Sequence, residues 1–236
     1  MINDPSINSE EFESVYEDKA IKAHLLDYTT GAMEGGQSVV LYTSRGEVFC
    51  AYNPCPNANA AVMWVSGARG GLDGPANGIY KDLSKDLVNS GLASLRLDYR
   101  YPGMSEECLV DASAGIAFLE KMGLTKIGIV GHSFGSAIAL GLAPLNHNIQ
   151  AVVSISSQLY GSHNVNKISN KPLLLIHGAL DEHIAPYNAE IIFESANEPK
   201  ELVILDQGDH SLSACRDELY KLLQTWLEKT LVENPR

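Results

Sequence analysis

A serine lies between two glycines in the run Gly131-His132-Ser133-Phe134-Gly135. An apolar strand-like run precedes it and a helix rich in small residues follows, so we expect Ser133 at a sharp turn between the two elements. Such a turn strains the backbone of the serine, and the flanking glycines remove side chains that would clash there. The turn raises the hydroxyl above the sheet and points the first helix amides at any anion formed nearby. The run therefore predicts a nucleophilic serine at position 133.

A serine hydroxyl is a poor nucleophile until a base takes its proton, and that base needs a carboxylate to fix its tautomer. An aspartate and a histidine follow the serine along the chain, each just past a different predicted strand: Asp181 and His210. The carboxyl ends of parallel strands meet at one edge of a sheet, so Ser133, Asp181 and His210 should converge. His210 is the candidate base and Asp181 the candidate acid.

Other side chains compete for these two roles. The competing carboxylates are Glu182, Asp206 and Asp209, of which the last two could orient the loop of His210. The six other histidines are His24, His147 and His163, expected at the surface, His177 and His183, expected to shape the loop of Asp181, and His132, expected to point away from the nucleophile.

Strands alternate with helices over most of the chain, which predicts a mainly parallel sheet covered by helices on both faces. The strands are expected at residues 60–65, 93–97, 126–130, 151–155, 173–176 and 202–205. The helices are expected at residues 79–89, 107–122, 136–142, 189–195 and 213–231. Before the first of these elements, residues 37–43 and 47–52 are predicted to form an antiparallel hairpin at the sheet edge. We expect residues 1–30 to form a loosely packed N-terminal arm with a short helix at 19–28, and residues 31–236 to form one domain.

The composition narrows the possible partners. The formal net charge of −12 disfavours nucleic acid and anionic membranes. The acidic N-terminus does not resemble a signal peptide, and no run approaches the roughly 18 apolar residues of a membrane span. The four cysteines are scattered without metal-site or disulfide spacing. We therefore expect a cytoplasmic protein with reduced thiols, no cofactor and no bound metal.

Together these motifs resemble the α/β-hydrolase fold, from about residue 37 to residue 231. The resemblance implies eight strands, mostly parallel, with the nucleophile after the fifth, the acid after the seventh and the base after the eighth. Counted from the hairpin, Ser133, Asp181 and His210 follow those strands. His177-Gly178-x-x-Asp181, with Pro186 downstream, resembles the acid loop of that family, which favours Asp181 over the other carboxylates. The run from Asp98 to Ser105 resembles a family segment that braces the nucleophile turn.

The resemblance also implies an oxyanion hole made of two backbone N–H groups. One should belong to Phe134, directly after the nucleophile. The other should come from the loop after the third strand, Ser66-Gly67-Ala68, and is assigned to Ala68 with Arg69 as the alternative. The Arg69 side chain could bind a substrate carboxylate, or Asp73 could neutralise it.

Only residues 156–171 separate the sixth and seventh predicted strands, too few for a lid of several helices. The resemblance is accordingly closest to lidless dienelactone-hydrolase-like proteins and carboxylesterases. Dienelactone hydrolases proper use a cysteine nucleophile, where this chain has Ser133. We expect a serine hydrolase that cleaves a carboxylic ester or related acyl bond of a small soluble substrate through an acyl-serine intermediate. A thioesterase, a peptidase and a non-catalytic ligand receptor on the same fold are the alternatives, and the oligomeric state is left open.

Overall fold

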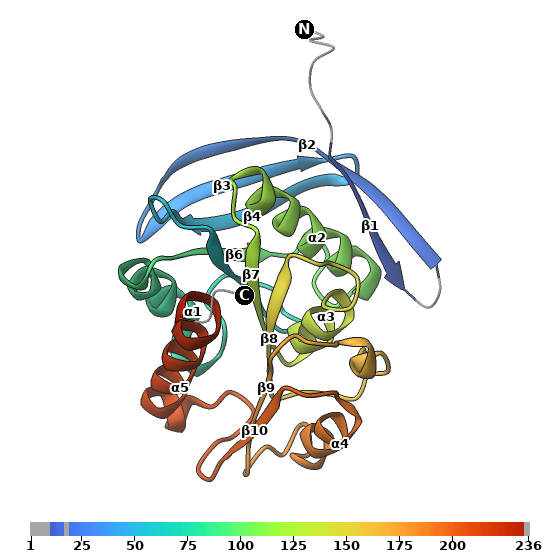
Figure 1. Cartoon of the computed structure of the whole chain (residues 1–236), viewed down its shortest axis with the longest axis vertical. Coiled ribbons are helices and arrows are strands. Elements are labelled where there is room, and N and C mark those ends of the chain that lie inside the picture. Colours follow the sequence, from blue (N-terminus) through green and yellow to red (C-terminus); the bar gives the residue numbers. More distant parts are fainter. Residues whose placement is uncertain (1–9, 17–18, 234–236) are drawn as a thin grey trace, which may run out of the picture.

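The computed structural model describes residues 10–16 and 19–233. Within these residues one sheet runs through the whole molecule, in the order β1-β2-β3-β4-β6-β5-β7-β8-β9-β10 (Figure 1). Its strands are β1 (Glu10–Tyr16), β2 (Lys19–Met33), β3 (Gly36–Thr43), β4 (Gly46–Asn53), β5 (Ala60–Val65), β6 (Leu92–Asp98), β7 (Lys126–His132), β8 (Ile149–Ile155), β9 (Leu173–Gly178) and β10 (Lys200–Leu205). The strands from β5 to β10 pair in parallel, and those from β1 to β4 pair antiparallel.

Helices cover both faces of the sheet, so its central strands are buried on both sides. The helices are α1 (Pro75–Asp86), α2 (Ser105–Lys121), α3 (Phe134–Leu142), α4 (Tyr187–Ser195) and α5 (Arg216–Glu228), with short helical turns η1 (Leu87–Ser90), η2 (Val165–Lys167), η3 (Ser213–Cys215) and η4 (Lys229–Glu233). One core lies beneath α2, α3 and α4, and the other beneath α1 and α5. This arrangement confirms the predicted α/β-hydrolase fold class. Among the helices of the described residues, none has the length and apolar content needed to cross a membrane.

The N-terminal part of the sheet differs from the sequence prediction. The described residues hold ten strands rather than eight, because β1 and β2 extend the sheet beyond the β3–β4 hairpin. The helix expected at 19–28 is wrong, since these residues belong to β2. Ala23 and Leu25 are buried with the less buried His24 between them, the alternation of a strand with one face on the core. The division into an arm at 1–30 and a domain at 31–236 stays a prediction, and residues 1–9 and 17–18 lie outside the described residues.

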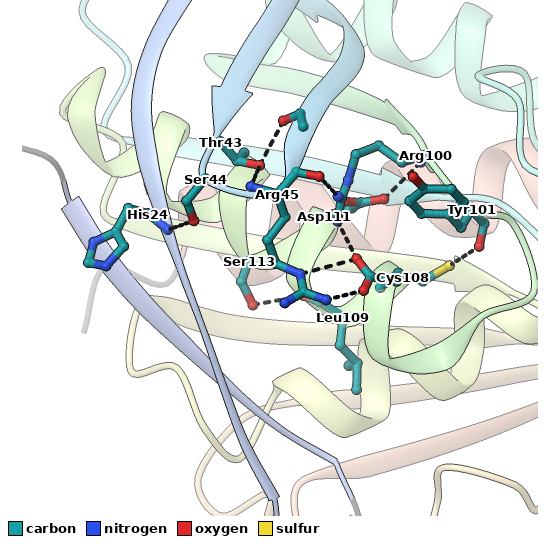
Figure 2. Close-up of polar contacts among 12 residues, drawn as sticks. His24, Thr43, Ser44, Arg45, Arg100, Tyr101, Cys108, Leu109, Asp111 and Ser113 are labelled. Carbon is teal, nitrogen blue, oxygen red and sulfur yellow. Dashed lines mark hydrogen bonds and ion pairs between the residues drawn. The ribbon is translucent and has the colours of Figure 1, made fainter.

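An ionic network with a buried centre at Arg100 and Asp111 ties the hairpin to α2. Arg100, just after β6, donates from its backbone N and from Nε to the two carboxylate oxygens of Asp111, at 2.8 and 2.5 Å. Its guanidinium also donates to Glu107 at 2.8 Å and to the carbonyl of Arg45 in the β3–β4 turn. Arg45 in turn pairs with Glu107. Figure 2 shows Arg45, Arg100 and Asp111 lying side by side, so the β3–β4 turn is fixed to the distant segment that joins β6 to α2.

Replacing Asp111 by alanine should lower the free energy of unfolding by about 2–3 kcal/mol. The Asp111 side chain is fully buried and that of Arg100 is 7% exposed, so the guanidinium would lose its principal partner inside the protein. The loss should fall below the roughly 3–5 kcal/mol of a fully unpaired buried charge, because Glu107 remains. Urea denaturation measures the change. The exposed neighbour Glu106 is the matched control: Glu106→Ala should change stability by about 0.5 kcal/mol or less. Equal effects of the two substitutions would contradict this prediction.

Candidate active site

Ser133 lies at a tight turn between β7 and α3, as the sequence predicts. Its backbone has φ 56° and ψ −117°, a conformation that side-chain-bearing residues seldom adopt. A Cβ on Gly131 would lie 2.1 Å from the carbonyl oxygen of Gly135, and one on Gly135 would lie 2.5 Å from that of Val65. Both positions therefore require glycine. The turn is anchored by the amide of Ser133, which donates to the carbonyl of Ile155 at the end of β8, at 2.8 Å.

The structure brings the three predicted side chains together. His210, in the loop after β10, has its Nε2 atom 3.0 Å from Oγ of Ser133. Its Nδ1 atom lies 2.8 Å from Oδ2 of Asp181, in the loop after β9. An ionised carboxylate can only accept, so in the neutral imidazole Nδ1 carries the proton and Nε2 accepts the hydroxyl proton of Ser133. The serine oxygen is thus paired with a base that can take its proton.

The carboxylate of Asp181 is buried among hydrogen-bond donors. Oδ1 accepts from the backbone amides of His183 and Ile184, each at 2.9 Å. Oδ2 accepts from His210 and lies 3.2 Å from Nε2 of His177, which also donates to the carbonyl of Ile184. Burial acts to raise the pKa of Asp181, but the bonds from Ile184, His210 and His183 outweigh it and the pKa is lowered. Asp181 is therefore held as an anion beside His210.

Several competing side chains have other roles. His177 and His183 shape the Asp181 loop, as expected from the sequence, and the ring of His183 lies 5.4 Å from that of His210 between centroids. Asp209 accepts a hydrogen bond from Ser211 at 2.9 Å. His132 donates from Nε2 to the carbonyl of His210, at 2.9 Å. No local feature of the sequence indicates this last contact.

The loop expected to supply the second oxyanion donor lies beside the serine. A Cβ on Gly67 would lie 3.6 Å from Cβ of Ser133, and Ala68 follows it in the chain. Asp98 fixes this loop by accepting from the amide of Gly71 at 2.6 Å. Asp98 thus holds the loop after β5, whereas the nearby Arg100 is bonded to the β3–β4 hairpin. Phe134 is the first residue of α3, where backbone N–H groups lack acceptors within the helix. The assignment of Phe134 and Ala68 as donors stays a prediction.

Asp73, the expected partner that could neutralise Arg69, lies elsewhere. Its Oδ1 atom is 3.6 Å from Nη1 of Arg96, a side chain only 3% exposed. Arg69 itself is exposed, in the loop next to Ser133. Its side chain is therefore left without the neutralising contact that the sequence suggested.

The model of the dienelactone hydrolase family matches residues 98–221, more than half of the chain. Solved structures resemble this chain over most of its length. A dienelactone hydrolase from Anabaena variabilis has a TM-score of 0.72 and 19% identity, covering 86% of this chain and 99% of its own. The esterase domain of a Rhodothermus marinus protein has a TM-score of 0.67 and 20% identity, covering 87% and 99%. Est1E from Butyrivibrio proteoclasticus has a TM-score of 0.68 and 15% identity, covering 86% and 98%. No curated protein sequence matches the chain.

The lowered pKa of Asp181 predicts how its contribution to stability depends on pH. A depressed carboxyl pKa stabilises the folded state above the unfolded aspartate pKa of about 3.9, and the contribution is lost as the pH falls through the folded value. Asp181→Asn removes this titration. The difference in unfolding free energy between the wild type and Asp181→Asn should therefore shrink between about pH 5 and pH 3. Urea titrations across this range measure it, and a difference that stays constant or grows in acid would contradict the prediction.

Proposed function

Because the chain belongs to the dienelactone hydrolase family, we propose that it is a serine hydrolase acting on carboxylic esters or related acyl bonds of small soluble substrates. The observation that carries this proposal is the position of His210, whose two ring nitrogens lie 3.0 Å from the Ser133 hydroxyl and 2.8 Å from the Asp181 carboxylate. That geometry suits a serine whose proton is removed as it attacks.

The reaction follows from these contacts. Oγ of Ser133 attacks the acyl carbonyl carbon while Nε2 of His210 takes the hydroxyl proton. Collapse of the tetrahedral intermediate breaks the bond to the leaving alcohol, whose oxygen receives that proton from His210. Water then attacks the acyl-Ser133 ester with His210 again as the base. The bond between the acyl carbon and Oγ then breaks, Oγ receives the proton from His210, and the carboxylic acid leaves. Asp181 stabilises the imidazolium formed in each half of the cycle.

Charge on the substrate oxygen would be stabilised by the backbone amides of Phe134 and Ala68. The position of Phe134 at the start of α3 supports the first assignment, since the helix dipole adds to its N–H group. The closeness of Gly67 to Ser133 and the tether from Asp98 to Gly71 support the second.

The short connection between β8 and β9 supports a site without a helical lid. Between the end of β8 at Ile155 and the start of β9 at Leu173 the chain forms only the short turn η2. Large apolar side chains are exposed in the segments that follow β6, β8 and β9: Tyr101, Met104, Leu159, Tyr160 and Leu180. These features support an open site that takes small substrates with apolar groups.

The proposed location is the cytoplasm. All four cysteines, Cys50, Cys55, Cys108 and Cys215, are unpaired, which suits a compartment that keeps thiols reduced. Burial raises the pKa of the Cys50 thiol above its ordinary value, so this thiol is unreactive.

Ser133→Ala should lower kcat for the hydrolysis of 4-nitrophenyl acetate by about four to six orders of magnitude, because the attacking oxygen is lost. The matched control is Ser195→Ala, which removes an exposed hydroxyl in α4 and should leave the rate unchanged. Circular dichroism checks that both variants are folded. Hydrolysis by Ser133→Ala at the wild-type rate would overturn the proposal. A parallel panel of thioesters and peptide amides distinguishes an esterase from a thioesterase or a peptidase.

A further inference from the structure

The backbone carbonyl of His210 accepts two hydrogen bonds from side chains on other elements. Nε2 of His132 lies 2.9 Å from this oxygen, and Oγ of Ser156 lies 3.1 Å from it. His132 ends β7 and Ser156 directly follows β8, so both donors come from outside the loop that carries His210. The Ser133–His210–Asp181 contacts do not include either of them.

The His132 ring is fixed in the form that donates. Burial is the main cause that lowers the pKa of His132, to about 4, so the ring is neutral near pH 7. A carbonyl can only accept, and the proton of the neutral ring therefore lies on Nε2. The ring also lies beside that of His210, with 5.1 Å between the two centroids. Both contacts hold the loop of His210 against His132, the residue that directly precedes Ser133.

Ser156 is held in an unfavourable backbone conformation. Its φ is 50°, where residues other than glycine are strained, and its side chain is fully buried. Its amide donates to the carbonyl of Ile176 in β9, at 2.8 Å. Such strain persists where the surrounding structure determines it, and it clusters at functional sites. Here the strained conformation accompanies the hydroxyl contact with the carbonyl of His210.

Hydrogen bonds to other elements hold the loop that carries His210. Between the end of β10 at Leu205 and the start of η3 at Ser213 it contains no helix or strand. The carbonyl of Gly208 accepts from the amide of Leu180 and the carbonyl of Ser211 from that of Ala76, each at 2.8 Å. The carbonyl of His210 lies between these two tethers. Its position sets where the imidazole stands relative to Asp181 and Ser133.

We propose that His132 and Ser156 are positioning residues that hold the carbonyl of His210 and so keep its imidazole between Asp181 and Ser133. This inference rests on the proposed function. A small displacement of a reacting group lowers the rate of the chemical step, and about 1 Å can cost about 100-fold. The His210 carbonyl is not needed to bind substrate. Loss of the two hydrogen bonds to it should therefore lower kcat and leave KM nearly unchanged.

The variants remove each donor separately and together. His132→Phe keeps a ring but has no donor, whereas His132→Gln keeps an N–H group at a similar reach. Ser156→Ala removes the hydroxyl, and Ser156→Gly does so while favouring the positive φ. Ser157→Ala is the matched control, because Ser157 is a neighbouring buried serine whose hydroxyl contacts Ser154 instead. Each folded variant is assayed for kcat and KM with 4-nitrophenyl acetate and for its rate of labelling by a fluorophosphonate.

We expect His132→Phe and each Ser156 variant to lower kcat and the labelling rate, with KM within about twofold of the wild type. In the double variant His132→Phe/Ser156→Gly, kcat should fall by about 100-fold. This fall should exceed the product of the two single effects, because each single variant retains one donor. His132→Gln and Ser157→Ala should stay near the wild type. A folded double variant with wild-type kcat and labelling rate, or one that loses only thermal stability, would overturn the inference. Failure of the proposed function gives a different result, since the wild type would then not be labelled at Ser133.

Discussion

At the turn that carries Ser133, two backbone segments approach so closely that residues 131 and 135 have no room for side chains. The carbonyl oxygen of Gly135 occupies the place of a Cβ at position 131, and the end of β5 occupies that of a Cβ at position 135. This close approach lets α3 begin directly over the sheet and holds Ser133 at a positive φ. The direction of the Ser133 hydroxyl and the exposure of the first amides of α3 both depend on it. The other contacts of the site are arranged around this fixed point.

The order of the strands brings the remaining groups within reach of that point. β7, β8, β9 and β10 are neighbours in the sheet, and similar backbone bonds join their ends. The amide of Ser133 donates to Ile155, that of Ser156 to Ile176 and that of Ala179 to Leu205, at 2.8, 2.8 and 2.9 Å. The loops that follow β7, β8 and β9 are thus each hydrogen-bonded to the end of the next strand in the sheet. The serine, the aspartate and the histidine therefore come from different strand ends and still meet at hydrogen-bonding distances.

The sequence predicts the parts of the site that have a local pattern. Glycine spacing marks the turn at Ser133, and the apolar runs before Asp181 and His210 place those residues at strand ends. The contacts of His132 and Ser156 with the His210 carbonyl join residues more than fifty positions apart and leave no such pattern. The pairing of Asp73 with Arg96 instead of Arg69 is a similar case. The predicted helix at residues 19–28 is wrong because the extended conformation of these residues depends on pairing with β1 and β3, and the local sequence pattern does not contain that pairing.

In the proposed mechanism, His210 and Asp181 activate Ser133 as a nucleophile. Peptide mapping by mass spectrometry after treatment with a fluorophosphonate tests it most directly, because the reagent forms a permanent bond with an activated serine. We expect a single phosphonyl group on Ser133, formed in step with the loss of esterase activity and nearly absent in His210→Ala. Loss of activity with Ser133 unmodified, or equal labelling of Ser133 in His210→Ala, would contradict it.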